Sequence, residues 1–343
     1  MTNKAAVVEK PGVLAVREVP MPEPGEYGSL CKMLYGATCT GTDGHLIRGR
    51  IPWPVTYPTV LGHESIGQII SVGRKARNHK IGDIVTRVGM WEQDCQRAGF
   101  NWNWGGFCSY GAAADFKAMR ADGYGDAQLN HFRFNHVLPP EFDPRAATMI
   151  ITWRETLSYM TRMGVNAGSS VLVLGSGGNG LSFTRMAKIL GAAYVAVVGN
   201  AARESLAERA GADRYLDYRD ADWDKTLCEG EGFDFIVDAV AARDGLDKAM
   251  RCLKPGGVCG IYGIETDPGN PVVIKPSACR GFTYYAGGYD EEETNDRVVG
   301  LVKNGALDAG IWLDIEHPFE LDDIASAFKS LDEKQIVKAL IKL

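Results

Sequence analysis

The stretch Ser170–Arg203, SVLVLGSGGNGLSFTRMAKILGAAYVAVVGNAAR, decides the fold of this chain. Residues 171–174 form an all-apolar run with β-branched side chains, which is typical of a strand buried on both faces. A glycine turn follows, then residues 181–190 with helical character and Gly191 as a stop signal. A second apolar run at 194–198 completes the pattern. It predicts strand, turn, helix and strand, the unit from which a doubly wound parallel α/β sheet is built.

The glycine turn carries the pattern G-x-G-x-x-G at Gly175, Gly177 and Gly180. Gly175 permits the tight turn, Gly177 leaves room for a pyrophosphate to approach the backbone, and Gly180 lets the helix pack closely on the strand. The N-terminus of that helix offers free N–H groups to the same pyrophosphate. The pattern predicts a dinucleotide site, and we count Gly178 and Asn179, which complete the turn, among its residues.

The end of the second strand indicates which dinucleotide is bound. Folds of this kind that bind NAD(H) place an acidic residue there, on the ribose 2′-hydroxyl. This chain has Gly199 at that position, and no carboxylate occurs before Glu204. Gly199 and Asn200 leave room for a 2′-phosphate, and Arg203 can pair with it, so we expect NADP(H) rather than NAD(H). The alternative is that Arg203 is a solvated helix residue.

Length and composition narrow the class of protein. A chain of 343 residues predicts two domains, and 45% hydrophobic with 23% charged residues is an ordinary globular composition. A net charge of −6 favours neither nucleic acid nor an anionic membrane as a partner. No apolar run approaches the roughly 20 residues of a membrane span, and the N-terminus lacks the apolar core of a signal peptide. We therefore expect a cytoplasmic location.

The eight cysteines are scattered and form no C-x-x-C pair. In a chain of this length, that predicts reduced thiols rather than a disulfide framework. It also excludes a zinc knuckle made of cysteines alone.

The segments on either side of the opening stretch differ in character. Residues 1 to about 150 are predicted to be rich in β-structure, with strands at 4–8, 14–19, 29–35, 66–72 and near 80–85, the second being the hairpin partner of the first. Residues 91–108 are predicted to be a surface loop whose tryptophans anchor it or line a cleft. The chain turns helical at 143–163. Beyond residue 203, predicted strands and helices alternate, and residues 291–343 are expected to contain two helices and a final strand at 337–341.

Six motifs are spread over nearly the whole chain: T-G-T-D-G-H (40–45), G-H-E (62–64), K-I-G-D-I-V (80–85), G-G-F-C-S-Y (105–110), V-L-V-L-G-S-G-G-N-G (171–180) and L-K-P-G-G (253–257). Together they resemble the medium-chain dehydrogenase/reductase superfamily, the zinc-type alcohol, polyol and glucose dehydrogenases. The resemblance implies a β-rich GroES-like catalytic domain formed by 1–150 and 291–343. It also implies a Rossmann domain formed by 151–290, with the active site in the cleft between the two domains.

The resemblance implies an NADP(H)-dependent oxidoreductase that moves hydride between nicotinamide and an alcohol or polyol, or the corresponding ketone or aldehyde. It also implies a homodimer or homotetramer. Within T-G-T-D-G-H, Thr42 would take the proton of the substrate hydroxyl and His45 would pass it on. The alternatives are a turn residue for Thr42 and a surface histidine for His45.

The resemblance further implies a catalytic zinc, but its ligands are only partly present. The place of the first ligand holds Thr40, and Cys39 lies one residue earlier, where an extended backbone would point its side chain elsewhere. His63 matches the second ligand and Glu64 the neighbouring acid. The place of the third ligand holds Ile151.

Two interpretations of this site stay open, because zinc needs three N, S or O donors. One is a zinc held by His63, Glu64 and either Cys39 or a shifted Glu155; the other is a hydrogen-bond network of His63 and Glu64 with Asp43. The four-cysteine lobe of many relatives is missing, so we expect no structural zinc.

Without zinc, Thr42, His45 and Arg154 are candidates to polarise the substrate oxygen. A hydroxylated substrate such as a sugar, polyol or cyclitol is favoured by the polar residues expected in the cleft: Thr42, His45, Glu64, Arg154 and Glu155. The alternative functions are a zinc-independent reductase of a carbonyl or enone, and a catalytically silent nucleotide-binding redox sensor. Turnover on a panel of alcohols and ketones distinguishes the sensor from an enzyme.

Overall fold

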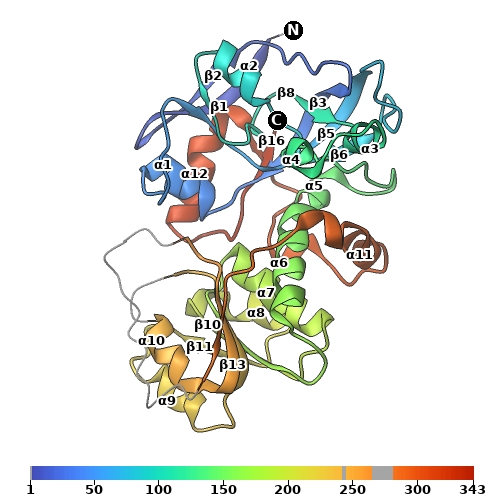
Figure 1. Ribbon diagram of the computed structural model, residues 1–343. Helices are drawn as coiled ribbons and strands as arrows, with labels where there is room; N and C mark the ends of the chain where they lie inside the picture. The colour runs from blue at the N-terminus through green and yellow to red at the C-terminus, as the bar shows by residue number, and fades with distance from the viewer. Residues whose placement is uncertain (1, 242–244, 265–280) are drawn as a thin grey trace. The chain divides into compact units, whose positions relative to one another are not determined.

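The computed structural model describes residues 2–241, 245–264 and 281–343, and the chain divides into two units (Figure 1). The first unit is Met1–Ile151 with Asn295–Leu343, and the second is Thr152–Thr294. Along the chain, helices α6 (Met149–Met163) and α11 (Glu291–Lys303) run from one unit into the other.

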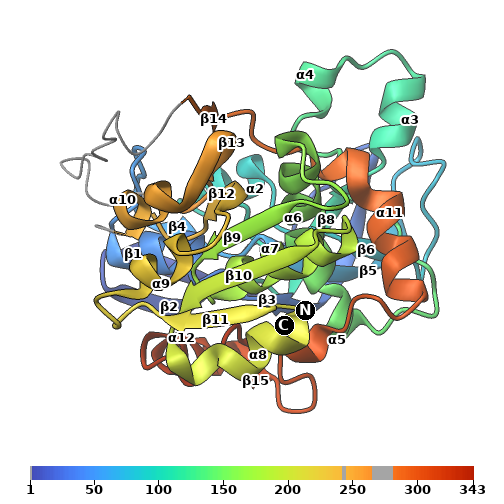
Figure 2. The same cartoon turned by 90° about the horizontal axis from the view of Figure 1, so that it is seen from below.

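The second unit is built on a six-stranded sheet with the order β11-β10-β9-β12-β13-β14, seen in Figure 2. All its described pairings are parallel. Counted along the chain the order is 3-2-1-4-5-6, that of the doubly wound dinucleotide-binding fold, which confirms the predicted fold class. The strands are β9 (Ser170–Leu174), β10 (Tyr194–Gly199), β11 (Arg214–Asp217), β12 (Phe233–Asp238), β13 (Leu253–Ile261) and β14 (Thr283–Tyr285).

Short helices alternate with these strands and share their apolar core. Leu172 and Ile236 of the sheet, both fully buried, belong to one cluster with Trp223 and Leu246 of the helices. The helices are α7 (Gly178–Ile189), α8 (Glu204–Ala210), α9 (Trp223–Cys228) and α10 (Gly245–Ala249), with 3-10 turns η1 (Ala201–Arg203) and η2 (Met250–Cys252).

Two cysteines of this unit overturn one expectation from the sequence. Cys228 at the end of α9 and Cys252 at the end of η2 form a disulfide, so the prediction of reduced thiols throughout is wrong. Their separation of 24 residues carries no sequence signal, because the pairing depends on how α9 packs against η2. The other described cysteines are buried, and Cys279 lies outside the described residues.

The first unit contains two β-sheets, with orders β2-β1-β4-β7 and β15-β16-β3-β5-β6, the second joined by β8 alongside β3. β1 and β2 form the antiparallel hairpin predicted from the sequence. The strands are β1 (Asn3–Lys10), β2 (Val13–Val19), β3 (Gly28–Ala37), β4 (Thr59–Val60), β5 (Glu64–Val72), β6 (Ile84–Thr86), β7 (Asn101–Trp102), β8 (Tyr110–Ala114), β15 (Phe319–Glu320) and β16 (Leu340–Lys342).

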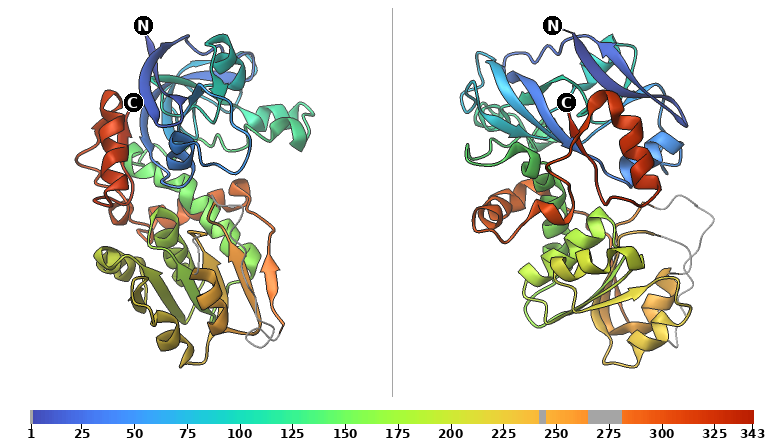
Figure 3. Two further views of the ribbon diagram at one scale, coloured as in Figure 1. Left: turned by 90° about the vertical axis from the view of Figure 1, so that its left-hand side faces the viewer. Right: turned by 180° about the vertical axis from the view of Figure 1, so that it is seen from behind.

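The two ends of the chain meet in this unit (Figures 1 and 3). β16 pairs with β3, and α12 packs Ile324 and Phe328 into one core cluster with Ala6 and Val8 of β1. The helices of the unit are α1 (Thr42–Arg48), α2 (Glu92–Arg97), α3 (Phe116–Ala121), α4 (Asp126–Leu129), α5 (Pro144–Ala147) and α12 (Ile324–Asp332), with η3 (Ala309–Ile311) and η4 (Leu321–Asp323).

Two local predictions need correction. Residues 91–108 are not simply a loop, because they contain α2 and β7, and Trp102 Nε1 donates to Met90 O at 2.9 Å. The final strand begins at Leu340 rather than residue 337. Lys338 precedes it and turns its side chain into the interior, where it is 3% exposed.

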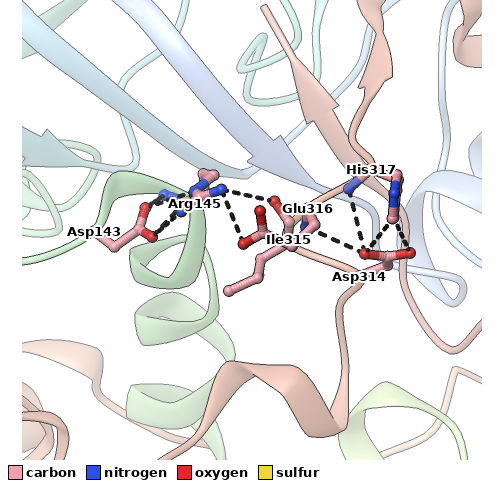
Figure 4. A network of polar contacts seen from close by, with 6 residues as sticks. All are labelled: Asp143, Arg145, Asp314, Ile315, Glu316 and His317. Atoms are coloured by element: carbon pink, nitrogen blue, oxygen red, sulfur yellow. Dashed lines mark hydrogen bonds and ion pairs between the residues drawn. The ribbon is translucent and has the colours of Figure 1, made fainter.

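A polar network ties α5 to the segment before β15 (Figure 4). The Arg145 guanidinium binds the Asp143 carboxylate on one side. On the other side it binds Ile315 O and Glu316 Oε1, each at 3.2 Å. Asp314 in turn accepts from the backbone of Glu316 and His317. The network holds residues 314–317 against the start of α5 within the first unit.

No helix among the described residues is both long enough and apolar enough to cross a membrane.

Candidate functional site

The G-x-G-x-x-G turn between β9 and α7 has the backbone that the sequence predicts. Gly175 has a φ of +109°, and a Cβ there would lie 2.4 Å from Val240. A Cβ at Gly180 would lie 2.0 Å from Gly175 O, so only glycine lets α7 start this close to the strand. A Cβ at Gly177 would meet nothing within 4 Å. That open side is where an anion can approach the N-terminus of α7, which starts at Gly178 and Asn179.

The end of β10 is crowded rather than open. A Cβ at Gly199 would lie 2.3 Å from Ser176 Oγ and 2.4 Å from the Tyr215 hydroxyl. The Asn200 backbone N–H donates to Ser176 Oγ at 3.1 Å, and the Tyr215 hydroxyl donates to Asn200 O at 2.6 Å. Any side chain at 199, an acidic one included, would displace these groups. The absence of a carboxylate is therefore built into the packing.

Arg203 lies at the same turn. Its Nη1 donates to Ser176 O at 3.3 Å, and the side chain is half-buried. Burial lowers the pKa of Arg203 and raises the pKa of Tyr215. The interpretation of Arg203 as a freely solvated helix residue is wrong, because η1 directs its guanidinium back to the glycine turn.

Ser176 and Tyr215 were missed at the sequence level. Ser176 occupies an x position of the motif, and Tyr215 lies on β11, next to β10 in the sheet but 39 residues from Ser176. The useful signal is the parallel sheet order, which brings the end of β11 beside the end of β10.

A second group of functional side chains lies in the first unit. One ligand atom each from Cys39, His63 and Glu64 lies within 4.8 Å of the other two, and all three residues are buried. The expectation that Cys39 points elsewhere is wrong. The chain leaves β3 at Ala37 and enters α1 at Thr42, so the backbone at Cys39 is not an extended strand and the alternation rule does not apply.

Two charged residues surround this group. His63 Nδ1 lies 3.5 Å from Asp43 Oδ1, and Asp43 Oδ2 accepts from the Cys39 backbone N–H at 2.8 Å. Burial opposes a charged ring at His63, but the Asp43 carboxylate outweighs it and raises the pKa of His63. Lys338 donates to Glu64 Oε2 and, at 3.0 Å, to Thr38 O. Asp43 therefore faces His63 at ion-pair distance, beside the donor group, without a hydrogen bond between the two facing atoms.

The other candidates for this site have surroundings of their own. Ile151 is fully buried in apolar packing. In the second unit, the Tyr262 hydroxyl donates to Glu155 Oε2 at 2.9 Å. Arg154 is fully buried and forms an ion pair with Glu291 at 2.9 Å. Arg154 is therefore a structural ion-pair partner, which overturns its candidacy as a group that polarises the substrate.

Thr42 and His45 occupy one turn of α1. Thr42 Oγ1 lies 3.7 Å from Cys39 Sγ, so the helix begins next to the donor group. His45 Nδ1 is buried and has no hydrogen-bond partner among the described residues. Burial lowers the pKa of His45, with smaller contributions from Arg48 and Arg50. Positions three apart on a helix are neighbours, so the two side chains can act in sequence.

Two family models match this chain, one in each of its two units for most of the matched residues. Residues 29–125 match the family described as alcohol dehydrogenase GroES-like domain. Residues 178–298 match the family described as zinc-binding dehydrogenase. The chain belongs to the zinc-type medium-chain dehydrogenase/reductase superfamily.

Individual relatives resemble this dehydrogenase over most of their length. An alcohol dehydrogenase of Cupriavidus necator is 26% identical over 370 aligned residues, covering 95% of this chain and 94% of the relative. A sorbitol dehydrogenase of Ovis aries is 29% identical over 283 residues, covering 77% and 76%. The structure of benzyl alcohol dehydrogenase from Acinetobacter calcoaceticus has a TM-score of 0.82 at 17% identity, covering 100% of this chain and 99% of that one, and shows the shared fold. The dehydrogenase is an oxidoreductase of the alcohol and polyol type, acting on CH–OH groups.

Proposed function

We propose that this dehydrogenase exchanges hydride between NADP(H) and an alcohol or polyol, or the corresponding ketone or aldehyde, and that Cys39, His63 and Glu64 hold a catalytic zinc. The observation that carries the proposal is the buried group of sulfur, nitrogen and oxygen donors in the first unit. Catalytic zinc sites have three such protein ligands and keep a position open for substrate.

The surroundings fit a divalent cation. Asp43 beside His63 Nδ1 is the carboxylate that commonly orients a metal-binding imidazole. Asp43 Oδ1 and His63 Nδ1 are both buried without a hydrogen-bond partner among the described residues, at 3.5 Å from each other. With Cys39 as a thiolate, the group contains three negative charges, on Cys39, Asp43 and Glu64. Its one positive charge is the ammonium of Lys338. A divalent cation makes such a buried group neutral, which removes a large desolvation cost.

Proton transfer is assigned to the chain's own residues. The Thr42 hydroxyl accepts the proton of the substrate alcohol, and His45 accepts it from Thr42. Because burial lowers the pKa of His45, its imidazole is neutral near pH 7 and able to take that proton. When bound, zinc supplies a Lewis acid for the substrate oxygen, and nicotinamide supplies the hydride acceptor.

The preference for NADP(H) is supported by the end of β10. Position 199 is a glycine, and the packing around it leaves no space for an acidic side chain. The Arg203 guanidinium lies at the glycine turn, where it donates to Ser176 O. A planar guanidinium favours a phosphate over a hydroxyl. We assign Gly175, Gly177, Gly178, Asn179 and Gly180 to the pyrophosphate, and Gly199, Asn200 and Arg203 to the ribose end.

The remaining assignments follow the superfamily. We assign 1–150 and 291–343 to the catalytic domain and 151–290 to the nucleotide domain. We expect a homodimer or homotetramer, which light scattering of the purified protein measures.

Metal content tests the zinc site. We expect about one zinc per subunit, with NADP(H)-linked activity lost on chelation. Cys39→Ser should lose most of the metal. Cys31→Ser is the matched control, because Cys31 is a buried free cysteine of the same unit whose pKa burial raises to about 12. Activity that persists in metal-free protein would favour the zinc-independent reductase. NADPH binding without turnover on any alcohol or ketone would favour the silent sensor.

Cofactor kinetics test the ribose site. The wild type should prefer NADPH to NADH, and Arg203→Ala should lower kcat/KM for NADPH by about 10-fold or more, as for a charge-assisted hydrogen bond. Arg209→Ala, an exposed arginine on α8, is the control. If both variants lower kcat/KM equally, Arg203 does not recognise the 2′-phosphate.

A further inference from the structure

The second unit contains a buried carboxylate that takes no part in the zinc group or the proton relay. Glu155 lies on α6 and is 7% exposed. The hydroxyl of Tyr262, the first residue after β13, donates to Glu155 Oε2 at 2.9 Å. Burying a carboxylate costs free energy that an uncharged side chain of the same shape would not. A carboxylate at this position therefore needs a structural or a functional reason.

Glu155 and Tyr262 lie at the carboxyl edge of the parallel sheet. The Tyr262 N–H donates at 2.8 Å to the carbonyl oxygen of Asp238, the last residue of β12. The Ala239 N–H donates at 3.0 Å to the carbonyl oxygen of Leu174, the last residue of β9. Tyr262 therefore begins the loop beyond the ends of three adjacent strands, β9, β12 and β13. Dinucleotides bind outside this edge in doubly wound folds.

The strand order indicates which half of the dinucleotide comes to Tyr262. The sheet has the order β11-β10-β9-β12-β13-β14 (Figure 2). In the proposed function, the ribose with the 2′-phosphate lies at Gly199, at the end of β10, and the pyrophosphate lies at Gly177, after β9. The fold consists of two mononucleotide-binding halves. We therefore expect the nicotinamide half to extend in the other direction, over the ends of β12 and β13, toward Tyr262 and Glu155.

Aromatic rings hold the tyrosine that donates to this carboxylate. The Tyr262 ring packs edge-to-face against Phe183 at 4.9 Å and against Tyr159 at 5.3 Å, measured between ring centres. Phe183 and Tyr159 are both buried. The two rings exclude water and fix the direction of the Tyr262 hydroxyl, which in turn orients Glu155. In such surroundings two opposite charges attract each other more strongly than they do in water.

We propose that Glu155, oriented by the Tyr262 hydroxyl, is the counter-charge of the oxidised nicotinamide ring and biases the enzyme toward reduction of a ketone or aldehyde. The oxidised ring is a cation and the reduced ring is neutral, so a nearby carboxylate stabilises bound NADP⁺ and leaves NADPH almost unaffected. Stabilising the oxidised form lowers the reduction potential of the bound pair, which makes NADPH the stronger hydride donor. The inference rests on the proposed binding of NADP(H) and adds the direction of the reaction.

In this direction the step balances with the groups already named. Two electrons and one hydrogen leave the reduced ring as hydride for the carbonyl carbon of the substrate. The carbonyl oxygen takes a proton that reaches it through His45 and Thr42. The nicotinamide ring gains one positive charge, which the Glu155 carboxylate meets. Glu155 exchanges no proton in this step, and its contribution is electrostatic.

The test measures the dissociation constants of NADP⁺ and NADPH separately, by calorimetric titration of the zinc-loaded protein without substrate. Glu155→Gln removes the charge and keeps an oxygen that accepts from Tyr262. We expect Kd to rise about 10-fold for NADP⁺ and less than about twofold for NADPH. A 10-fold change in the ratio of the two constants corresponds to about 30 mV in the potential of the bound pair.

Two further variants at the same position complete the test. Glu155→Asp keeps the charge and should hold both constants within about threefold of the wild type. Glu155→Thr removes the charge with a smaller side chain, and it is titrated in place of Glu155→Gln if that variant does not fold. The matched control is Glu208→Gln, an exposed glutamate of the same unit on α8, which should change neither constant.

The inference is overturned if Glu155→Gln weakens both forms of the cofactor equally, as a purely structural role would, or if it weakens neither. It is also overturned if Glu155→Gln loses zinc, because Glu155 would then be the displaced third metal ligand. A wild type that prefers NAD(H) would count against the proposed cofactor alone, and the same ratio with NAD⁺ and NADH would still decide the role of Glu155. A wild type that binds no dinucleotide would overturn the proposed function together with this inference.

Discussion

Lys338 and Glu64 form an ion pair inside the first unit in which each side chain is only 2% exposed, although 274 positions separate them in the chain. The ammonium binds Glu64 Oε2, while Glu64 Oε1 lies 3.8 Å from His63 Nε2. The carboxylate can therefore serve the lysine with one oxygen and a metal with the other. This relationship makes Lys338 a positioning residue of the proposed zinc site.

Replacing this lysine should affect metal-free and zinc-bound protein differently. In Lys338→Met without metal, Glu64 is buried and loses its counter-charge, which should cost roughly 3–5 kcal/mol of unfolding free energy. Zinc then restores a positive charge, so its stabilising effect should exceed that in the wild type. Chemical denaturation with chelator and with zinc measures both quantities.

Lys342→Met is the control for this prediction. Lys342 pairs with Glu320 at the surface, with side chains 52% and 59% exposed, and its loss should cost at most about 1 kcal/mol. An equal stabilisation by zinc in Lys338→Met and the wild type would contradict the positioning role.

Two alanine substitutions in the glycine turn should separate folding from cofactor binding. Gly180→Ala places a Cβ 2.0 Å from Gly175 O and should destabilise the protein by about 1–3 kcal/mol. At Gly177 a Cβ meets no atom within 4 Å, so Gly177→Ala should fold like the wild type yet bind NADPH at least about 10-fold more weakly. Thermal unfolding and NADPH titration measure the two effects. A similar loss of stability in both variants would contradict the separate roles assigned to Gly180 in packing and Gly177 in cofactor binding.

Introducing the acid that is typical of NAD(H) enzymes should fail here. Gly199→Asp would clash with Ser176 Oγ and the Tyr215 hydroxyl, at a cost of about 1–3 kcal/mol, and should not create a preference for NADH. Adding Tyr215→Phe removes one clashing oxygen and should recover part of the stability. The measurements are kcat/KM for both cofactors and the melting temperature. A stable Gly199→Asp variant that prefers NADH would contradict this prediction, because Ser176 and Tyr215 would then have moved aside at little cost.

The pH dependence of alcohol oxidation should report His45. Burial, and to a lesser extent Arg48 and Arg50, lower the pKa of His45. Because the relay needs a neutral ring, the acidic limb of the pH–rate profile should lie below the ordinary histidine value of about 6.5. Arg50→Gln removes a positive charge, which raises the pKa of His45 and moves the limb to higher pH. Arg209→Gln should leave the limb in place. If the acidic limb lies at the same pH in Arg50→Gln as in the wild type, His45 is not the proton acceptor.

The Cys228–Cys252 disulfide should be detectable by mass and by stability. Alkylation before and after reduction should label two further cysteines only after reduction. Cross-linking residues 24 positions apart stabilises by about 3 kcal/mol on the chain-entropy account. Reduction should therefore lower the melting temperature of the wild type and leave that of Cys228→Ser unchanged. Full labelling of the unreduced protein would show that both thiols are free.

Local sequence patterns were sufficient for the nucleotide-binding turn and its fold. The apolar run before Gly175, the glycine spacing and the helix stop at Gly191 depend on neighbouring residues only, because turn, strand and helix signals act over a few positions. Confirmed features such as the β1–β2 hairpin and the parallel sheet are of this kind.

The metal group and the partner of Arg154 could not be predicted in this way. The family motif puts Thr40 rather than Cys39 at the place of the first ligand, yet the chain between β3 and α1 brings the Cys39 thiol close to His63. Arg154 looked available until the structure paired it with Glu291. A buried charged residue pairs with whichever opposite charge the fold places beside it. The distance between the two residues along the sequence does not indicate which residue that is.

The sequence by itself determined that this chain is a two-domain dehydrogenase with a glycine-rich dinucleotide turn and without an acid at the end of the second strand. Only the tertiary structure decided which side chains fill the space around Gly199, that Lys338 holds Glu64, and that the Tyr262 hydroxyl donates to Glu155. The physical reason is that the first set rests on backbone conformations selected locally. The second set rests on contacts between segments that are separated in the chain, by about 300 residues in the case of Lys338 and Thr38, and such contacts exist only once the fold has brought those segments together.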